Sequence, residues 1–98
     1  MTDMEHKTFC AALSSYGAQA QITMVFEEMA ELQDVLCKFL RGRVDSDTLA
    51  NIAEEIADVG IMLDQMAIEF EVEDAVAEQR ASKVRRLLGR LEYVEQED

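Results

Sequence analysis

Residues 26–43 read FEEMAELQDVLCKFLRGR, and residues 49–66 read LANIAEEIADVGIMLDQM. In both stretches apolar residues recur every three or four positions, which is the period of an amphipathic α-helix. We predict helices over residues 18–40 and 47–69, with Gly42 ending the first. Because only a short loop separates them, the two helices should pack against each other in antiparallel orientation.

The two central helices differ in how much apolar surface they carry. The predicted helix at 18–40 has one broad apolar face, formed by Ile22, Phe26, Met29, Leu32, Leu36, Phe39 and Leu40. The main apolar face of the helix at 47–69 is formed by Leu49, Ile52, Ile56, Val59, Met62, Leu63, Met66 and Phe70. A second apolar face of that helix is formed by Ala50, Ala57, Ile61 and Ile68. A helix with two apolar faces needs two neighbours, which indicates a central position or a subunit interface.

Two outer helices complete the prediction. A helix over about residues 3–14 begins at Thr2, whose spacing to Glu5 resembles a capping box. A last helix over about residues 73–92 should turn its apolar residues inward, namely Val76, Val84, Leu87, Leu88 and Leu91. Most of the chain's positive charge lies on this last helix, on Arg80, Lys83, Arg85, Arg86 and Arg90. The tail at 95–98 is expected to fray.

The composition is that of a helical protein. The chain has 98 residues, no proline and 49% hydrophobic residues, and it shows no repeat and no linker-like segment. Glu, Ala and Leu are the most frequent residues, and with Met and Gln they favour helices. We therefore predict a single all-α domain over residues 1–98, built from four helices. A chain of this length is near the lower limit for a self-sufficient core, so partner chains would help to stabilise it.

The charge of the chain restricts its partners. The net charge is −12, with 21 acidic and 9 basic residues, whereas nucleic-acid polymers are bound by clustered Lys and Arg. We therefore expect no nucleic-acid polymer as a partner, and a nucleotide substrate would need a metal ion to screen its charge. The opening MTDMEHK lacks the features of a signal peptide, and no apolar run approaches the roughly 20 residues of a membrane span. We expect a cytoplasmic protein that does not enter a membrane.

Each central helix carries an acidic pair that is followed by a third acid. These residues are Glu27, Glu28 and Glu31 on the first helix and Glu54, Glu55 and Asp58 on the second. Residues three apart are neighbours on a helix surface, so Glu28 and Glu31 project together. Glu55 and Asp58 do the same on the second helix. If the helices pack antiparallel, these four carboxylates can converge on one place.

The direction of these carboxylates separates two interpretations. Spacing alone fits equally well a metal site and a solvated face with salt bridges between successive turns. Glu55, however, falls within the main apolar arc of its helix, and Glu28 lies beside Val35 and Phe39. An ionised carboxylate near a core costs several kcal/mol unless it is paired or binds a metal. The direction of Glu28 and Glu55 therefore favours a metal site. Glu27 points further outward and is a weaker candidate for a metal ligand.

The type of ligand favours one class of metal ion. Oxygen ligands without thiolate or imidazole suit Mg²⁺, with Mn²⁺ as a possible substitute. The only histidine, His6, is far from the acidic motifs. Zinc sites, di-iron sites and phosphohydrolases of the histidine and aspartate metal type are therefore disfavoured.

Three segments together resemble a known family. Glu-Glu-x-x-Glu at 27–31 and Glu-x-x-Asp at 55–58 are similar to the metal signature of the MazG-like nucleotide pyrophosphohydrolases, which belong to the all-α NTP pyrophosphatase group. The two stretches quoted first, and KVRRLLGRL at 83–91, resemble a short subgroup of that family. The resemblance covers nearly the whole chain. It implies a four-helix MazG-like bundle that assembles as a dimer or a dimer of dimers, with each site built from more than one chain.

The resemblance also implies an activity and a set of site residues. The activity is hydrolysis of a nucleoside triphosphate between its α- and β-phosphates, which gives the monophosphate and pyrophosphate. The residues that match the metal ligands of the family are Glu28, Glu31, Glu55 and Asp58, and Glu27 is expected to assist a second metal ion or to orient water. Candidate phosphate contacts are Lys38, Arg41, Lys83 and Arg86, with the last two preferred. Candidate base contacts are Tyr16 or Phe9 for stacking and Gln19 or Gln21 for hydrogen bonds.

A second hypothesis comes from a different class of protein. The same acidic helices would suit a non-catalytic helical dimer that binds a basic partner protein. This hypothesis predicts neither magnesium dependence nor nucleotide hydrolysis, whereas the first predicts both.

Overall fold

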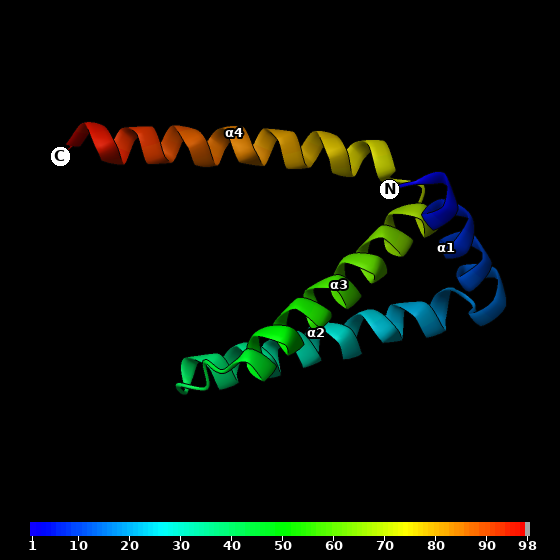
Figure 1. Cartoon of the computed structure of the whole chain (residues 1–98). Helices are drawn as coiled ribbons and strands as arrows, with labels where there is room; N and C mark the ends of the chain where they lie inside the picture. The colour runs from blue at the N-terminus through cyan, green and yellow to red at the C-terminus, as the bar shows by residue number, and fades with distance from the viewer. Residues whose placement is uncertain (98) are drawn as a thin grey trace.

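The computed structural model describes residues 1–97 as four α-helices with no β-strand among them (Figure 1). The helices are α1 (Asp3–Tyr16), α2 (Ala18–Leu40), α3 (Ser46–Glu69) and α4 (Glu73–Glu97). The all-α prediction is confirmed, and the predicted bounds of the two central helices differ from the observed ones by at most one residue. α1 and α4 are both longer than predicted. α1 ends at residue 16 where residue 14 was predicted, and α4 continues through residues 95–97, where fraying was expected. Asp98, the end of that predicted tail, lies outside the described residues.

Local capping interactions set the helix ends. Thr2 Oγ1 accepts a hydrogen bond from the backbone N–H of Glu5 at 3.1 Å, as the capping-box spacing predicts. Gly17 separates α1 from α2 with a φ of +88°, a conformation that a residue without a Cβ adopts at low cost. At the start of α3, Asp45 Oδ1 accepts from the backbone N–H of Thr48 at 2.8 Å and from its hydroxyl at 2.9 Å. Hydrogen bonds and backbone conformations within a few residues of each end therefore explain where these helices begin and end.

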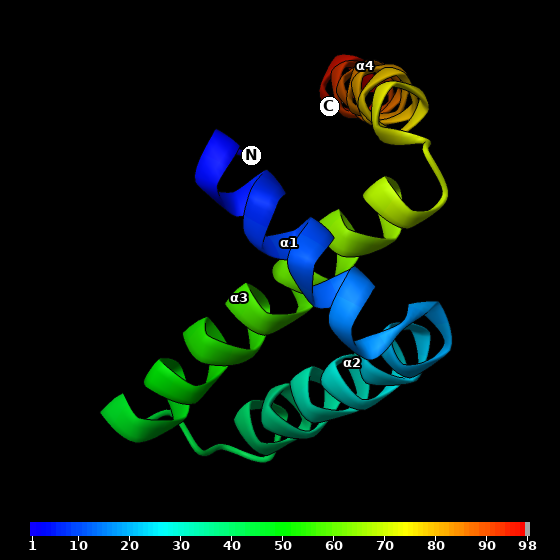
Figure 2. The same cartoon turned by 90° about the vertical axis from the view of Figure 1, so that its right-hand side faces the viewer.

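α2 and α3 form an antiparallel hairpin, which is the most extensive helix contact of the fold. Gly42, with a φ of +94°, ends α2 and allows the tight loop to α3. At the other end of the hairpin, Gln21 Nε2 donates to Gln65 Oε1 at 2.7 Å and fixes the register of the pair. α1 packs across this end and touches both helices (Figure 2).

The core that this arrangement buries is small. Its buried hydrophobic residues are Phe9 and Leu13 of α1, Val25 and Val35 of α2, and Met62 of α3. Polar side chains are also buried in the hairpin, namely Gln21, Thr48 and Gln65. Buried polar groups are stable only when hydrogen-bonded, and the Gln21–Gln65 bond and the Asp45 cap supply such bonds here.

Much of the predicted apolar surface of α2 and α3 stays exposed. On α2, Phe26 is 65% exposed and Leu40 is 81% exposed. On α3, a stripe with seven-residue spacing is 50–58% exposed, formed by Leu49, Ile56, Leu63 and Phe70. Much of the broad apolar face predicted for α2 is therefore uncovered in the single chain, because α3 covers only the side that carries Val25 and Val35. Ala50, Ala57 and Ile61 of the second face of α3 are exposed as well.

The exposed stripes of α2 and α3 lie on the same side of the hairpin. Glu28 and Glu55 point into the gap between the helices, and Met29 and Ile56 each follow one of them in sequence. Each successive residue lies about 100° further around its helix. Because the two helices are antiparallel, the residue after Glu28 and the residue after Glu55 therefore lie on the same side of the hairpin. We define the apolar face by these residues and their exposed neighbours: Phe26, Met29, Leu36, Leu40, Leu49, Ile56 and Leu63. By the same geometry, Glu31 and Asp58 lie toward the opposite side.

α4 projects away from the hairpin and does not close a bundle (Figure 1). Among the described residues it packs only against α3, and its first residue approaches α1, where Glu73 Oε1 lies 3.7 Å from His6 Nε2. Glu71, with a φ of +54°, turns the chain between α3 and α4. The apolar residues predicted to point inward are instead 50–56% exposed, namely Val76, Val84, Leu87, Leu88 and Leu91. That prediction is wrong for the single chain, because in the part that the structure describes α4 packs only against α3 and most of its length has no neighbouring helix (Figure 1).

None of the four helices is long and apolar enough to cross a membrane, in the part of the chain that the structure describes.

Candidate metal centre

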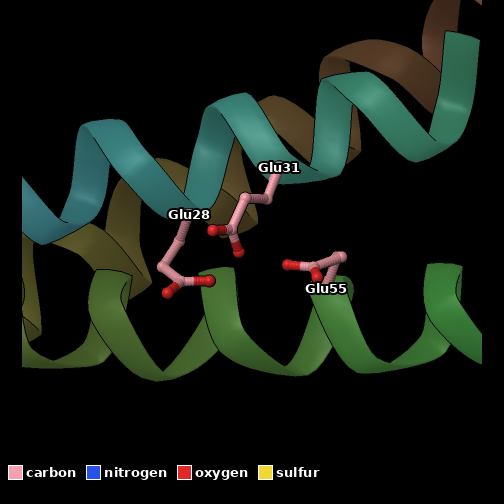
Figure 3. A group of neighbouring side chains, drawn as sticks. All are labelled: Glu28, Glu31 and Glu55. Atoms are coloured by element: carbon pink, nitrogen blue, oxygen red, sulfur yellow. The ribbon is translucent and has the colours of Figure 1, made fainter.

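Three carboxylates meet in the gap between α2 and α3 (Figure 3). Glu28 and Glu31 extend from successive turns of α2, and Glu55 extends from α3 toward them. One oxygen of each lies within 4.8 Å of the others. The i, i+3 spacing on α2 and the antiparallel packing thus bring together three of the four acids that the sequence singled out.

Two of these carboxylates are shielded from water without a partner. One oxygen of Glu28 and one of Glu55 have almost no solvent contact and accept no hydrogen bond from the described residues. Buried oxygens of this kind are normally satisfied by protein or by water. An unsatisfied pair of carboxylate oxygens at the same place, facing a third carboxylate, is the arrangement that a divalent cation would complete.

Burial and like charge both raise the pKa of these two carboxyl groups. For Glu28, burial raises the pKa above its ordinary value of 4.5, followed by the negative charges of Glu31, Asp58 and Glu55. For Glu55, burial again raises the pKa first, followed by the charges of Glu31 and Asp58. The cluster is therefore unfavourable as a set of bare anions. A bound cation would reverse both effects, because it neutralises the charge and supplies the missing ligand contacts.

Asp58 lies beside the cluster and is not one of the three converging acids. It is half-buried on α3, and its charge contributes to the raised pKa of both Glu28 and Glu55. The register set by Gln21 and Gln65 places Asp58 across from Glu28. The fourth predicted ligand is thus close to the site, on its edge. Glu27 is exposed and points outward, as its position on the helix predicts.

A cavity of about 520 Å³ opens beside the cluster. Glu31, Glu55 and Lys38 line it, so a cation predicted to hold phosphate lies next to the carboxylates. Lys38 Nζ pairs with Asp34 Oδ2 at 2.9 Å, and Asp34 lines the same cavity. Asn51 lines the same cavity and was not identified from the sequence. The sequence feature that could have identified Asn51 is its position one helical turn before Glu55, on the same side of α3.

The other predicted phosphate contacts do not lie at the cluster. Arg41 is exposed in the loop after α2. Lys83 and Arg86 are exposed on α4, the helix that projects away from the hairpin. Within one chain, therefore, Lys38 is the predicted basic residue that shares a cavity with the carboxylates.

A second cavity, of about 570 Å³, lies where α1 meets α2. Its lining comprises Tyr16, Ala20, Gln21, Thr23, Met24 and Met62. It thus brings together Tyr16 and Gln21, two of the candidate base contacts. Gln19 is exposed, and Phe9 is part of the core, so Phe9 cannot serve as a stacking surface.

Comparisons with known proteins identify no relative. No protein-family model matches the chain, and no curated protein or solved structure shows significant similarity to it. The residue motifs and the geometry of the carboxylate cluster are therefore the basis for inferring function.

Proposed function

We propose that the chain is a magnesium-dependent nucleoside triphosphate pyrophosphohydrolase of the MazG-like type. It would convert a ribo- or deoxyribonucleoside triphosphate to the monophosphate and pyrophosphate, as a cytoplasmic enzyme that cleans the nucleotide pool. The observation that carries this proposal is the convergence of Glu28, Glu31 and Glu55, with solvent-shielded oxygens on two of them. Hydrolysis adds water to the phosphoanhydride, breaks the bridging P–O bond and releases a proton.

The residues present fit a hard divalent cation. Glu28, Glu31 and Glu55 would hold Mg²⁺ or Mn²⁺, and Asp58 would complete or orient the ligand set. Bound metal neutralises the charge that develops on phosphate oxygens and polarises water. Lys38, at the adjacent cavity, would hold a phosphate, and the outward-pointing Glu27 would orient water.

The proposed enzyme is a homodimer or a dimer of dimers. Two features support self-association: the apolar face on the hairpin and the uncovered apolar residues of α4. Contiguous apolar surface of this extent marks an interaction site in soluble proteins. In such an assembly a partner's α4 would bring Lys83 and Arg86 to the substrate phosphates, complete the MazG-like bundle and complement the acidic hairpin.

Turnover of a nucleotide panel tests this function. The chain should release pyrophosphate and monophosphate from at least one common or modified triphosphate, and removal of Mg²⁺ should abolish turnover. Glu55→Gln should lower kcat by about 100-fold or more, because it removes a metal ligand. Glu54→Gln is the matched control, since Glu54 is the exposed neighbour on the same helix, and it should keep near-normal turnover.

Two outcomes would reject the proposal. One is the absence of turnover for every nucleotide with Mg²⁺ and Mn²⁺, and the other is unchanged turnover in Glu55→Gln. Calorimetry that detects neither Mg²⁺ nor nucleotide binding would favour the alternative, a non-catalytic acidic dimer that binds a basic partner protein.

A further inference from the structure

A thiol, an imidazole and a carboxylate follow one another where α1 meets the start of α4. Cys10 Sγ lies 3.7 Å from His6 Nδ1, and the other ring nitrogen, His6 Nε2, lies 3.7 Å from Glu73 Oε1. His6 and Cys10 are one turn apart on α1, whereas Glu73 is far from both in the sequence and is brought to them by the turn between α3 and α4 (Figure 1). The fold thus assembles a nucleophile, a base and a group that orients the base, which is the arrangement of an activated thiol.

The position of Glu73 determines which nitrogen of His6 accepts a proton. A neutral imidazole carries its proton on one nitrogen, and a carboxylate beside Nε2 favours the form that is protonated there. Nδ1 then presents its lone pair to the Cys10 thiol and can take the thiol proton. The same carboxylate stabilises the imidazolium that this transfer forms, as in the triads of hydrolytic enzymes.

The surroundings of the imidazole are acidic. A cavity of about 530 Å³ beside it is lined by His6, Ile68, Glu71, Glu73, Asp74 and Ala75. Among the described residues, the titratable groups placed about His6 are therefore Cys10 on its own helix and three carboxylates from the α3–α4 turn and the start of α4. A cavity with this charge attracts cations and repels anions. A small molecule that approaches Cys10 from this side should therefore carry a positive charge.

The chain contains a second thiol for comparison. Cys10 is half-buried, and the side chains of His6 and Glu73 beside it are 46% and 43% exposed, so a small molecule can approach. Cys37 is exposed on α2, and it has no imidazole beside it, because His6 is the only histidine of the chain. Accessibility alone therefore favours reaction at Cys37, whereas activation by a base favours reaction at Cys10.

We propose that Cys10 is a reactive thiol that forms mixed disulfides with small cationic disulfides, with His6 as its base and Glu73 as the positioning residue. The Cys10 proton moves to His6 Nδ1, and Sγ attacks one sulfur of the disulfide RSSR, so that the S–S bond breaks as the new bond forms. The leaving thiolate takes the proton from His6 and departs as RSH. The Cys10 sulfur is oxidised, the departing sulfur is reduced, and RSSR is the only oxidant that the exchange needs. The proposed triphosphate hydrolysis is not involved, because none of these residues belongs to the carboxylate cluster.

Rates of mixed-disulfide formation at the two cysteines of one chain test the activation. Cystamine, a disulfide with an ammonium group on each arm, should react at Cys10 about tenfold or more faster than at Cys37, because a positioned base accelerates proton transfer. Mass spectrometry of peptides from the acid-quenched protein separates the two sites. Equal rates, or faster reaction at the more exposed Cys37, would overturn the proposal.

The preference for a cation is tested with a matched reagent. Hydroxyethyl disulfide has the same two-carbon arms as cystamine, with a hydroxyl in place of each ammonium group. The ratio of the Cys10 rate to the Cys37 rate should be several-fold higher with cystamine, because the cavity beside His6 is acidic. The same ratio with both reagents would overturn the preference for cationic disulfides.

Removal of the base tests the role of His6. His6→Asn should lower the Cys10 rate by about tenfold or more and leave the Cys37 rate unchanged. Thr8→Asn, at an exposed position of the same helix, is the matched control and should keep the fast rate. Both positions are exposed, so both variants should fold. An unchanged Cys10 rate in His6→Asn would contradict the proposal.

The pH profile tests the positioning role of Glu73. Glu73→Gln removes the charge that stabilises the imidazolium, so the rise of the Cys10 rate with pH should move to higher pH, whereas the Cys37 profile should not move. Glu78→Gln, an exposed acid of α4 that does not line the cavity, should leave both profiles unchanged. If Glu73→Gln lowers the Cys10 rate equally at every pH, or does not change it, the positioning role is rejected.

Discussion

At Glu28 and Glu55, the requirement of folding for apolar buried side chains conflicts with the carboxylates that the proposed chemistry needs. Each belongs to a side of its helix that packs inward, yet each carries a group that prefers water. Their inward direction could be predicted from helical periodicity alone, since the angle between residues on one helix is fixed by sequence. The position of Asp58 at the edge of the cluster could not, because it depends on the crossing of two helices. Such locally unfavourable groups are expected at functional sites.

Stability should respond to pH through these two carboxyl groups. Their pKa values in the folded chain are raised above 4.5, so between that pH and the raised values the folded state binds more protons than the unfolded state. The free energy of unfolding of the metal-free protein should therefore fall as the pH rises through this window. Denaturant unfolding in a chelator should show that Glu28→Gln and Glu55→Gln stabilise the protein at neutral pH and have little effect at the acidic end.

Adding Mg²⁺ at neutral pH should restore the lost stability of the unsubstituted chain, because metal binding stabilises the folded state by mass action. The exposed neighbour variant Glu54→Gln should show smaller effects, because the charge of Glu54 is the smallest of the causes that raise the pKa of Glu55. Equal pH profiles for Glu55→Gln and Glu54→Gln would contradict this account of the cluster.

At the scale of single helices, residues close to each helix end determine where the helix begins and ends. The bounds of α2 and α3 could be predicted almost to the residue, because Gly42 and Asp45 act through backbone groups within a few positions of themselves. What sequence did not determine is which apolar residues of α2 become buried. Val25 and Val35 are buried while Phe26 is exposed, and this depends on the side from which α3 approaches.

The Asp45 cap should contribute measurably to the stability of the hairpin. Hydrogen bonds from Thr48 lower the pKa of this carboxyl below its ordinary value of 3.8. Its contribution is therefore present above that pH and is lost as the pH falls through the lowered pKa. Asp45→Ala should lower the melting temperature by several degrees at neutral pH. Asp47→Ala, in the first turn of the same helix, should have a smaller effect, and an equal loss in both variants would argue against a capping role.

At the scale of the whole molecule, the sequence predicted four helices and the antiparallel packing of α2 and α3, but not the position of α4. α4 carries the apolar pattern of a packed helix, and periodicity does not reveal whether its neighbour belongs to the same chain or to another. The turn at Glu71 directs α4 away from the hairpin, so the chain extends over 54 Å although its hydrophobic core holds few residues. A chain of this size with so much uncovered apolar surface is expected to gain stability from a second copy.

Self-association through the apolar face should be sensitive to one buried charge. Leu63 is 50% exposed at the centre of the α3 stripe, so Leu63→Glu should fold as a monomer while placing a carboxylate in the interface. Burying an unpaired charge costs several kcal/mol, which corresponds to a rise of at least about 100-fold in the dimer Kd. Light scattering after size exclusion should show a dimer or tetramer for the unsubstituted chain and a monomer for this variant at micromolar concentration.

The matched control for Leu63→Glu is Ala11→Glu, which adds the same charge at an exposed position of α1, a helix that contributes no residue to the apolar face. It should leave the oligomer intact. If the unsubstituted chain is monomeric, or if both variants dissociate equally, the apolar face is not the interface. If Leu63→Glu is monomeric and also loses turnover while its carboxylate cluster still binds Mg²⁺ in calorimetry, the result supports a site that the partner's α4 completes. In that case the projection of α4 follows from the assembly, because a helix that serves a partner's site must extend beyond its own hairpin.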